Sequence, residues 1–201
     1  MNLLRVIRVV TWTAIAAIAA GTAAIYFLGP GNGGLATSIS GKAAIGGPFS
    51  LVSHKGERVS NETLRGKPYL AFSGFTNCPH ICPTTLFELS DMIDELGADF
   101  DEFNVLLISV DPERDSQELL ATYMTAFDPR ILALRGTRKE TDAVVKSFAA
   151  AAIKVPLDGG NYTMEHTAGV YLMDENGEYA GLMRMDEPRE QRMQALRDLA
   201  G

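Results

Sequence analysis

The alternation of strand-like and helix-like segments after residue 45 constrains the fold most strongly. Short apolar runs at 68–75 and 103–110 flank a stretch, 84–96, whose apolar residues recur at helical spacing. Strands that alternate with helices favour a sheet covered on both faces. An Asn-Gly pair at Asn176 predicts an antiparallel hairpin near the end of the chain. We therefore predict an α/β domain built on a mixed sheet flanked by helices.

Turn and capping signals place the remaining elements of this domain. Asp115 and Thr137 are each followed three residues later by Glu, which is the pattern of a capping box at a helix start. We expect strands at 49–53, 57–60, 131–135, 167–174 and 178–184, and helices from Asp115 to Phe127, after Thr137, and over 187–200.

The two cysteines of the chain, Cys78 and Cys82, lie between the strand predicted at 68–75 and the helix predicted at 84–96. In open α/β sheets, reactive loops lie at the carboxyl ends of strands, and this loop has that position. Two thiols at a helix N-terminus can form a redox couple or can bind one soft metal ion as thiolates. The helix dipole favours the thiolate in either case. A purely structural disulfide is the third reading, although so short a loop would add little stability.

The N-terminal part of the chain predicts a membrane anchor. Residues 1–8 carry two arginines and no acid, and residues 9–28 are uncharged and long enough to span a bilayer as a helix. We expect a cytoplasmic segment at 1–8, a transmembrane anchor at 9–28, a Gly-rich flexible tether at 29–44 and a folded domain at 45–201. A cleaved signal peptide, with small residues around Ile18, is the alternative.

Charge and compartment restrict the partners of the domain. The net charge of −7 and the lack of a basic patch argue against nucleic acid as a partner. The predicted orientation puts the domain outside the cytoplasm, where free thiols tend to oxidise. The short N-terminus lacks an Arg- and Ser-rich transit peptide, so we expect a bacterial inner-membrane protein with a periplasmic domain rather than a mitochondrial one.

Six short motifs occur in a characteristic order along the chain. They are Gly46-Gly47-Pro48-Phe49-Ser50-Leu51, Gly66-Lys67-Pro68, Gly74-Phe75-Thr76, Cys78-Pro79-His80-Ile81-Cys82-Pro83, Ser109-Val110-Asp111-Pro112-Glu113-Arg114-Asp115 and Glu165-His166-Thr167-Ala168. Together they resemble the Sco/SenC family of membrane-anchored copper proteins over about residues 45–200. The resemblance implies a thioredoxin-like fold and a role in assembling cytochrome c oxidase, as a metallochaperone rather than an enzyme with turnover.

The resemblance also implies the site. The family's copper ligands fall on Cys78, Cys82 and His166, with Cu(I) as the expected ion and Cu(II) left open. Thiolate sulfur with one imidazole suits soft Cu(I). Asn77 and His80 depart from the residues common at those positions, but neither replaces a ligand. The implied partner is cytochrome c oxidase subunit II or another copper-receiving protein.

Two other functions compete with copper binding. The protein could be a thiol-disulfide oxidoreductase that keeps the acceptor's cysteines reduced, with Cys78 and Cys82 as its redox pair and a thiol-disulfide reductant as its partner. The C-x3-C spacing differs from the C-x-x-C of dedicated oxidoreductases. A peroxidase of the peroxiredoxin kind is disfavoured because Asn77 precedes Cys78, where such enzymes have a Thr-Pro-type loop.

The segment from Asp111 to Asp115 is read as a loop that ends in a helix cap, with a partner surface as the alternative. Met164, Met183 and Met185 carry thioethers that could meet copper, but methionine more often fills cores. We therefore leave the methionines outside the predicted site.

Overall fold

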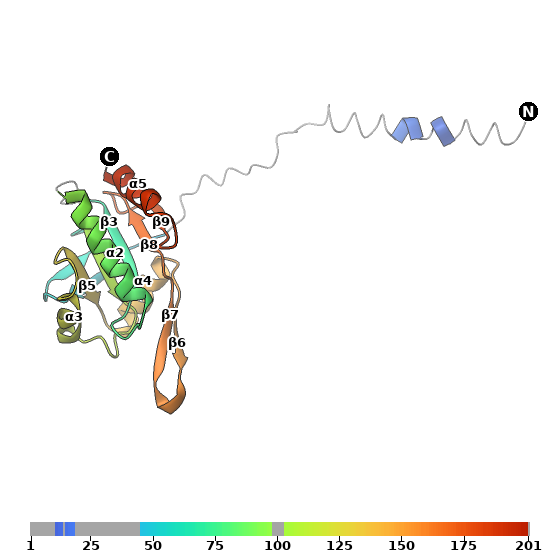
Figure 1. Cartoon of the computed structure of the whole chain (residues 1–201). Coiled ribbons are helices and arrows are strands. Elements are labelled where there is room, and N and C mark those ends of the chain that lie inside the picture. The colour runs from blue at the N-terminus through green and yellow to red at the C-terminus, as the bar shows by residue number, and fades with distance from the viewer. Residues whose placement is uncertain (1–10, 14, 19–44, 98–102, 201) are drawn as a thin grey trace, which may run out of the picture. The chain divides into compact units, whose positions relative to one another are not determined.

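Strands and helices alternate in the middle of the described domain, as the sequence predicts, and consecutive strands precede and follow this part (Figure 1). The computed structural model describes residues 11–13, 15–18, 45–97 and 103–200. The elements are β1 (Ser50–Ser53), β2 (Arg58–Ser60), β3 (Tyr69–Gly74), α2 (Ile81–Leu96), β4 (Asn104–Ser109), α3 (Gln117–Met124), β5 (Ile131–Arg135), α4 (Arg138–Ser147), β6 (Ala152–Pro156), the 3-10 turn η2 (Asp158–Gly160), β7 (Tyr162–His166), β8 (Val170–Met173), β9 (Tyr179–Met183) and α5 (Arg189–Ala200).

The main sheet is mixed, with seven strands in the order β2-β1-β5-β4-β3-β8-β9. Its three central strands, β5, β4 and β3, run parallel, and the flanking strands pair antiparallel to their neighbours. Parallel strands covered on both faces read as continuous apolar runs, which is why the sequence identified β3 and β4 readily. The turn at Gly177, which has φ +77°, joins β8 and β9 as the Asn-Gly pair predicts.

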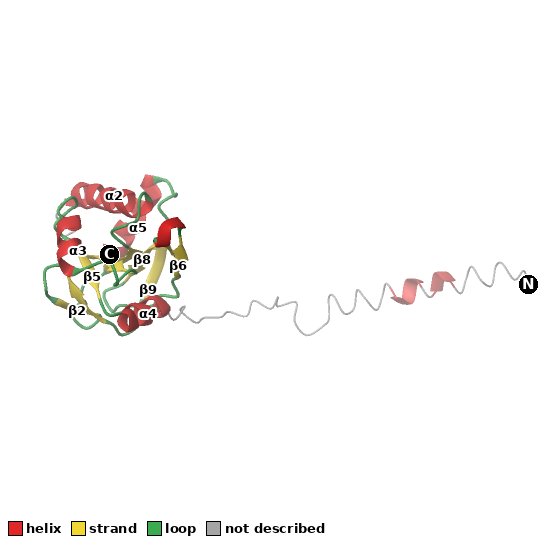
Figure 2. Ribbon diagram, turned by 90° about the horizontal axis from the view of Figure 1, so that it is seen from below, coloured by secondary structure: helices red, strands yellow, loops and turns green. Residues whose placement is uncertain are grey.

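Alternate residues of the central strands pack into two separate cores. Leu70 and Phe72 of β3 face a core shared with α2, α3 and α5, whereas Tyr69 and Ala71 face a second core that contains Val144 of α4. Figure 2 shows α2 and α4 on opposite sides of the sheet. Two-sided burial fixes the register of β3, because a one-residue slip would exchange the two faces.

Of the two predicted helix caps, the one at Thr137 is confirmed and the one at Asp115 is wrong. Thr137 and Glu140 form the predicted capping box at the start of α4. The cap of α3, however, is Ser116, whose Oγ accepts from Leu119 N at 3.1 Å. Asp115 is fully buried and uses its carboxylate inside the molecule instead. A side chain that is buried in this way cannot reach the exposed amides of the helix.

Helix α2 begins at Ile81, three residues before the predicted start, and so contains Cys82. Pro83 misled the prediction, since proline usually ends or precedes a helix. Its missing N–H costs nothing within the first turn, where amides have no partner inside the helix. The second cysteine therefore has the fixed geometry of a helix rather than that of a loop.

The hairpin of β6 and β7 was not predicted. It forms a separate two-stranded sheet and extends away from the main sheet (Figure 1). The strand β6 is nowhere fully buried, so its sequence lacks the alternating apolar pattern that marks a half-buried strand. Gly159 and Gly160 at its tip adopt positive φ values of +75° and +79°, which glycine permits without strain.

Of the predicted anchor, residues 9–28, the structure describes 11–13 and 15–18, and the rest lies outside the described residues, as does the whole predicted tether at 29–44. Residues 11–13 and 15–18 are helical. Among the described residues, no helix combines the length and the apolar character that crossing a membrane requires.

Candidate metal centre

The cysteine loop leaves the main sheet at the carboxyl end of β3, as predicted. Cys78 N donates to Phe75 O at 3.3 Å, which turns the chain back toward the sheet. Cys82 follows in the first turn of α2, and its amide donates to Cys78 Sγ at 3.4 Å. The backbone thus places both sulfurs on one side of the loop. The two thiols are not joined by a disulfide in the structure.

Gly74 allows the close approach of Cys82 to the end of β3. A Cβ at this position would lie 3.1 Å from Cys82 Sγ, 2.8 Å from Leu107 Cδ1 and 3.0 Å from Phe72 Cε1. Real Cβ atoms essentially never come as close as the 2.8 Å contact with Leu107, and the other two contacts are tighter than most. The glycine is therefore needed for the space it leaves to the buried sulfur.

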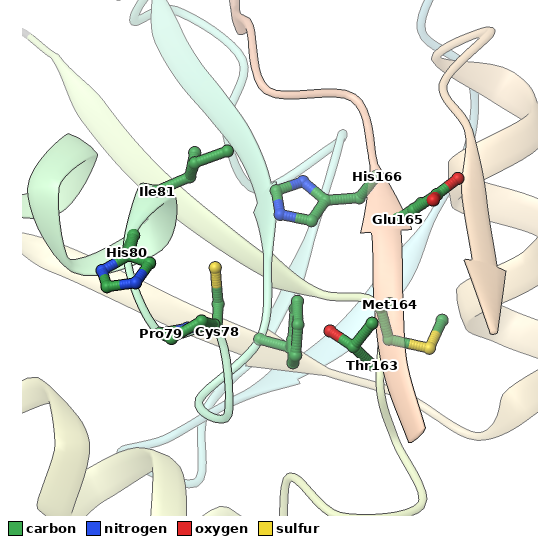
Figure 3. A pocket seen from close by; sticks show the side chains of 9 residues that line it. Cys78, Pro79, His80, Ile81, Thr163, Met164, Glu165 and His166 are labelled. Carbon is green, nitrogen blue, oxygen red and sulfur yellow. The ribbon is translucent and has the colours of Figure 1, made fainter. Parts of the chain in front are cut away.

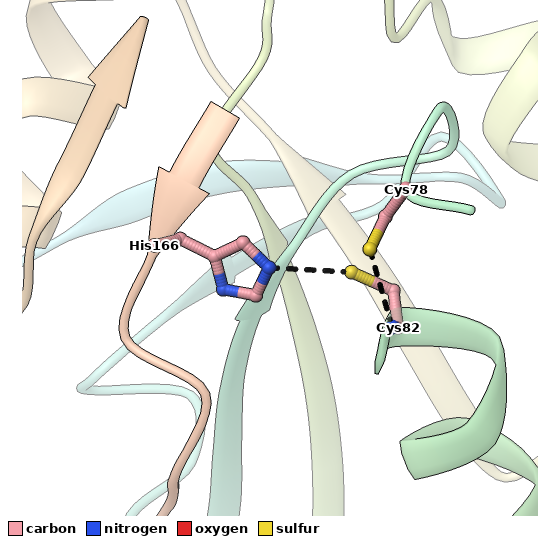
Figure 4. A group of neighbouring side chains, drawn as sticks. All are labelled: Cys78, Cys82 and His166. Carbon is pink, nitrogen blue, oxygen red and sulfur yellow. Dashed lines mark hydrogen bonds between the residues drawn. The ribbon is translucent and has the colours of Figure 1, made fainter. Parts of the chain in front are cut away.

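His166, the last residue of β7, completes the site from the second sheet (Figure 4). Its Nε2 lies 3.5 Å from Cys82 Sγ, and the ligand atoms of Cys78, Cys82 and His166 all lie within 4.8 Å of one another. The rings of Phe72 and Phe75 meet the imidazole edge to face, at centroid distances of 5.9 and 5.8 Å. The sequence placed His166 just before a strand; it does precede β8, and it also ends the unpredicted strand β7.

A backbone contact fixes the tautomer of His166. Its Nδ1 lies 3.0 Å from the carbonyl oxygen of Thr167. A carbonyl oxygen can only accept, so we assign the ring proton to Nδ1. Nε2 then carries the free lone pair and points toward the sulfurs. A hydrogen bond of this kind to the other nitrogen is typical of metal-binding histidines.

The separation of the three donor atoms fits one bound metal ion. Metal–sulfur bonds of about 2.3 Å and metal–nitrogen bonds of about 2.0 Å, at trigonal angles, place donor atoms roughly 3.7–4.0 Å apart. The three atoms found within 4.8 Å of one another need only small adjustments to reach that geometry. Two sulfurs and one imidazole nitrogen form a donor set that suits soft Cu(I).

Burial sets the protonation of the site in the copper-free protein. It raises the pKa of the Cys82 thiol well above its usual range and lowers the pKa of His166. Desolvation is the largest effect on the pKa of Cys82, and a backbone hydrogen bond from Phe75 opposes it. A neutral imidazole is ready to bind metal, whereas Cys82 must lose its proton when metal binds.

An open pocket gives access to this group (Figure 3). Its walls are Phe75, Cys78, Pro79, His80 and Ile81 from the cysteine segment, and Thr163, Met164, Glu165 and His166 from β7. Cys78 is partly exposed in the pocket, while Cys82 is fully buried behind it. Both ligand-bearing segments therefore face solvent on one side.

Comparisons with known proteins agree with this geometry. The model of the SCO1/SenC family matches residues 37–201. The chain belongs to the SCO1/SenC family. Among relatives, it is 37% identical over 142 residues to human "Protein SCO1 homolog, mitochondrial", covering 69% of this chain and 47% of that protein. It is 33% identical over 159 residues to a SCO2-like protein of Rickettsia prowazekii, covering 78% of each.

Solved structures of Sco proteins share the fold. Copper-bound ScoI of Bradyrhizobium japonicum is 41% identical, with a TM-score of 0.73 over 77% of this chain and 99% of that one. BsSco, described as a member of the Sco family of cytochrome c oxidase assembly proteins with a disulfide switch, is 26% identical, with a TM-score of 0.61 over 77% and 92%. These matches confirm the predicted thioredoxin-like α/β fold with a mixed sheet. The chain spans about half the length of the first curated relatives it matches.

The other residues of this SCO1/SenC protein that the sequence analysis considered do not join the ligand group. His80 is exposed at the rim of the pocket. Met164 lines the pocket but is buried in the core, and Met183 is buried in the same core. The segment 111–115 is a loop, as predicted, but Asp111 and Asp115 are buried in it, and Ser116 rather than Asp115 caps α3. A loop at the carboxyl end of β4, beside β3, was the signal that could have placed them near the cysteines.

Proposed function

We propose that this protein binds Cu(I) through Cys78, Cys82 and His166 and delivers it during assembly of cytochrome c oxidase. The arrangement of these three donors in one open pocket is the observation that carries the proposal. Membership of the SCO1/SenC family and the likeness to copper-bound Sco structures support it. Subunit II of the oxidase, at its binuclear copper centre, is the proposed acceptor. Copper is cargo in this role.

A three-coordinate site suits transfer rather than storage. An incoming ligand can bind the metal before an old one leaves, which a closed tetrahedral site prevents. In this site the pocket opens on the side of Cys78 and His166, whereas Cys82 lies behind them. We therefore infer that Cys78 and His166 are released to the acceptor first and that Cys82 is released last.

A Cu(I) titration of the reduced and the oxidised protein tests this function. Reduced protein should bind one Cu(I) under anaerobic conditions, in competition with a chelator of known affinity. Protein with a Cys78–Cys82 disulfide should bind essentially none, because a disulfide offers no thiolate. Copper should also protect both thiols from alkylation. Equal binding by the two forms would contradict the proposed site.

A thiol-disulfide oxidoreductase remains the second candidate, since two unlinked thiols lie within reach of each other. His166→Ala separates the two functions. The variant should retain copper poorly, whereas thiol-disulfide exchange needs only the sulfurs and should persist. Failure of this variant to support oxidase assembly at low copper would favour the carrier, and normal assembly would favour the reductase. Cys82→Ser is the control that should fail in both cases.

We propose further that residues 9–28 anchor the protein in a bacterial inner membrane, with the domain in the periplasm. The uncharged run after Arg5 and Arg8 supports this orientation. A periplasm-active reporter fused after Gly201 should be active, and a cytoplasm-active reporter should be silent. The reverse pattern would contradict the orientation, and release of the protein by an osmotic wash would favour a cleaved signal.

A further inference from the structure

The copper ligands come from two sheets that no backbone ladder joins within the described residues. Cys78 and Cys82 follow β3 of the main sheet, whereas His166 ends β7 of the separate hairpin. The hairpin extends away from the main sheet, so its own ladder does not set its position beside the cysteines (Figure 1). The short connection from His166 to β8, which pairs with β3, tethers this end of the hairpin. Side-chain contacts must hold the rest of the hairpin against the main sheet.

The loop 111–115 holds the start of the cysteine segment through Asp115. It follows β4, the neighbour of β3, and so lies at the sheet edge from which the cysteine loop leaves. The carboxylate of Asp115 accepts from Thr76 Oγ1 at 2.6 Å, from Thr76 N at 3.3 Å and from Ser109 Oγ at 2.5 Å. Thr76 is two residues before Cys78. The buried carboxylate thus fixes the start of the ligand loop.

Two other residues of this loop, Asp111 and Arg114, hold the histidine hairpin through Tyr162. Tyr162 Oη donates to the fully buried carboxylate of Asp111 at 2.8 Å. Arg114 Nη1 donates to Tyr162 O at 2.9 Å, and the guanidinium carbon lies 3.7 Å from the centroid of the Tyr162 ring. Arg114 also forms an ion pair with Asp111. Tyr162 is therefore held by its hydroxyl, its carbonyl and its ring.

Strand geometry connects Tyr162 to the ligand. Side chains two and four residues apart share a face of a strand, so Tyr162, Met164 and His166 point the same way from β7. The guanidinium of Arg114 also lies 5.8 Å from the Phe75 ring, which meets the imidazole of His166 edge to face at 5.8 Å. If Tyr162 moved relative to Arg114, strand β7 and the Phe75 ring would transmit the movement to the imidazole of His166.

We propose that Tyr162 is a positioning residue for copper, and that Asp111, Arg114 and Tyr162 form a clasp that keeps His166 against the two sulfurs. This inference rests on the proposed copper site. The clasp determines how long the imidazole stays on the metal. It leaves the dithiol couple unchanged, because both sulfurs belong to the cysteine loop and α2. The exposed ion pair between Glu113 and Lys154 adds little, as surface ion pairs generally do.

Tyr162→Phe tests the clasp because it removes one hydroxyl and keeps the ring. The Cu(I) affinity of the reduced variant should fall roughly 3- to 30-fold, in the range expected for one hydrogen bond to a buried charged group. The reduction potential of the Cys78–Cys82 couple should stay at the wild-type value. Asp111→Asn keeps an acceptor for the hydroxyl but removes the ion pair with Arg114, so it should lose at least as much affinity as Tyr162→Phe.

A double variant shows whether Tyr162 acts through His166. In the His166→Ala background, Tyr162→Phe should cause no further loss of Cu(I) affinity, because the imidazole that it positions is gone. Two variants serve as matched controls: Tyr179→Phe on β9, and Arg184→Gln, which removes an exposed ion pair with Asp186 that does not involve Tyr162. Both should bind Cu(I) within about twofold of wild type, as expected for contacts of little energetic weight.

A copper-free measurement separates failure of the clasp from failure of the proposed function. In Tyr162→Phe, amides of β6 and β7 should exchange hydrogen faster, while those of β3 and β4 stay protected. If wild-type protein binds no Cu(I), the proposed function fails, whatever the exchange shows. Wild-type affinity in Tyr162→Phe, or an equal loss in the His166→Ala background, would overturn the positioning role of Tyr162.

Discussion

At the scale of single residues, the site depends on small contacts that set the state of each donor. The carbonyl of Thr167 holds the proton of His166 on Nδ1, which leaves Nε2 for the metal. Burial keeps the Cys82 thiol protonated until metal displaces the proton. Cys78, which is partly exposed, is the sulfur that solvent and partners meet first. The three proposed donors therefore differ in their access to solvent and partners.

Gly74→Ala should disturb the site by steric crowding alone. The new methyl group would lie 3.1 Å from Cys82 Sγ and 2.8 Å from Leu107 Cδ1 in a packed core. We expect a loss of roughly 1–3 kcal/mol in the free energy of unfolding, as overpacking generally costs, and weaker Cu(I) binding. Chemical denaturation and the Cu(I) competition assay measure the two effects.

Gly181→Ala on β9 is the matched control for Gly74→Ala. Its methyl group would meet only Leu172 Cδ1, at an ordinary contact distance of 3.7 Å. We expect wild-type copper affinity and little change in stability. Equal effects of the two substitutions would show that the space beside Cys82 has no special role.

At the scale of elements, the positions of α2 and of the β6–β7 hairpin determine where Cys82 and His166 lie. Helix α2 carries Cys82 because it starts at Ile81, and the hairpin brings His166 from the far side of the pocket. The turn after β1 is a second place where a histidine fixes an element. His54 donates its backbone N–H to Ala133 O and accepts from Ala133 N through its side-chain Nδ1 at 3.1 Å, which ties the turn to β5.

The His54 contact should make stability depend on pH. Burial, and then the charge of Lys55, lower the pKa of His54 in the folded protein. The unfolded chain then takes up a proton near the usual value of about 6.5, and the folded chain resists it. Stability from this group is present above that pH and is lost as the pH falls toward the lowered pKa.

Thermal denaturation of copper-free protein between pH 7.5 and 5 measures this loss. His54→Asn, which keeps an oxygen acceptor for the Ala133 amide without titrating, should show a smaller decrease in melting temperature across that range. An identical pH dependence of the two proteins would show that His54 does not contribute.

At the scale of the whole molecule, the sequence predicted an element correctly where a local pattern of residues reflects burial or a turn. The apolar runs of β3 and β4, the capping box at Thr137 and the Asn-Gly turn at Asn176 each predicted an element that the structure contains. The hairpin of β6 and β7 escaped prediction because its strands are half-exposed and show no clear period.

The candidate site, too, could be predicted from the sequence only in part. The ordered motifs identified the residues that now lie together as Cys78, Cys82 and His166. The contacts of Asp111 and Asp115 could not be predicted, since both join segments about 40 to 50 residues apart in sequence. The raised pKa of Cys82 was also missed, because it depends on depth of burial rather than on local sequence.

The central claim is that the two cysteines and the histidine bind one Cu(I) ion together. X-ray absorption at the copper edge, on reduced protein loaded with one equivalent of Cu(I), tests it most directly. We predict a three-coordinate first shell of two sulfurs and one imidazole nitrogen in the wild-type protein. His166→Ala should lose the nitrogen and keep the two sulfurs. A first shell of two sulfurs in the wild-type protein, or an unchanged spectrum in His166→Ala, would contradict the three-ligand site.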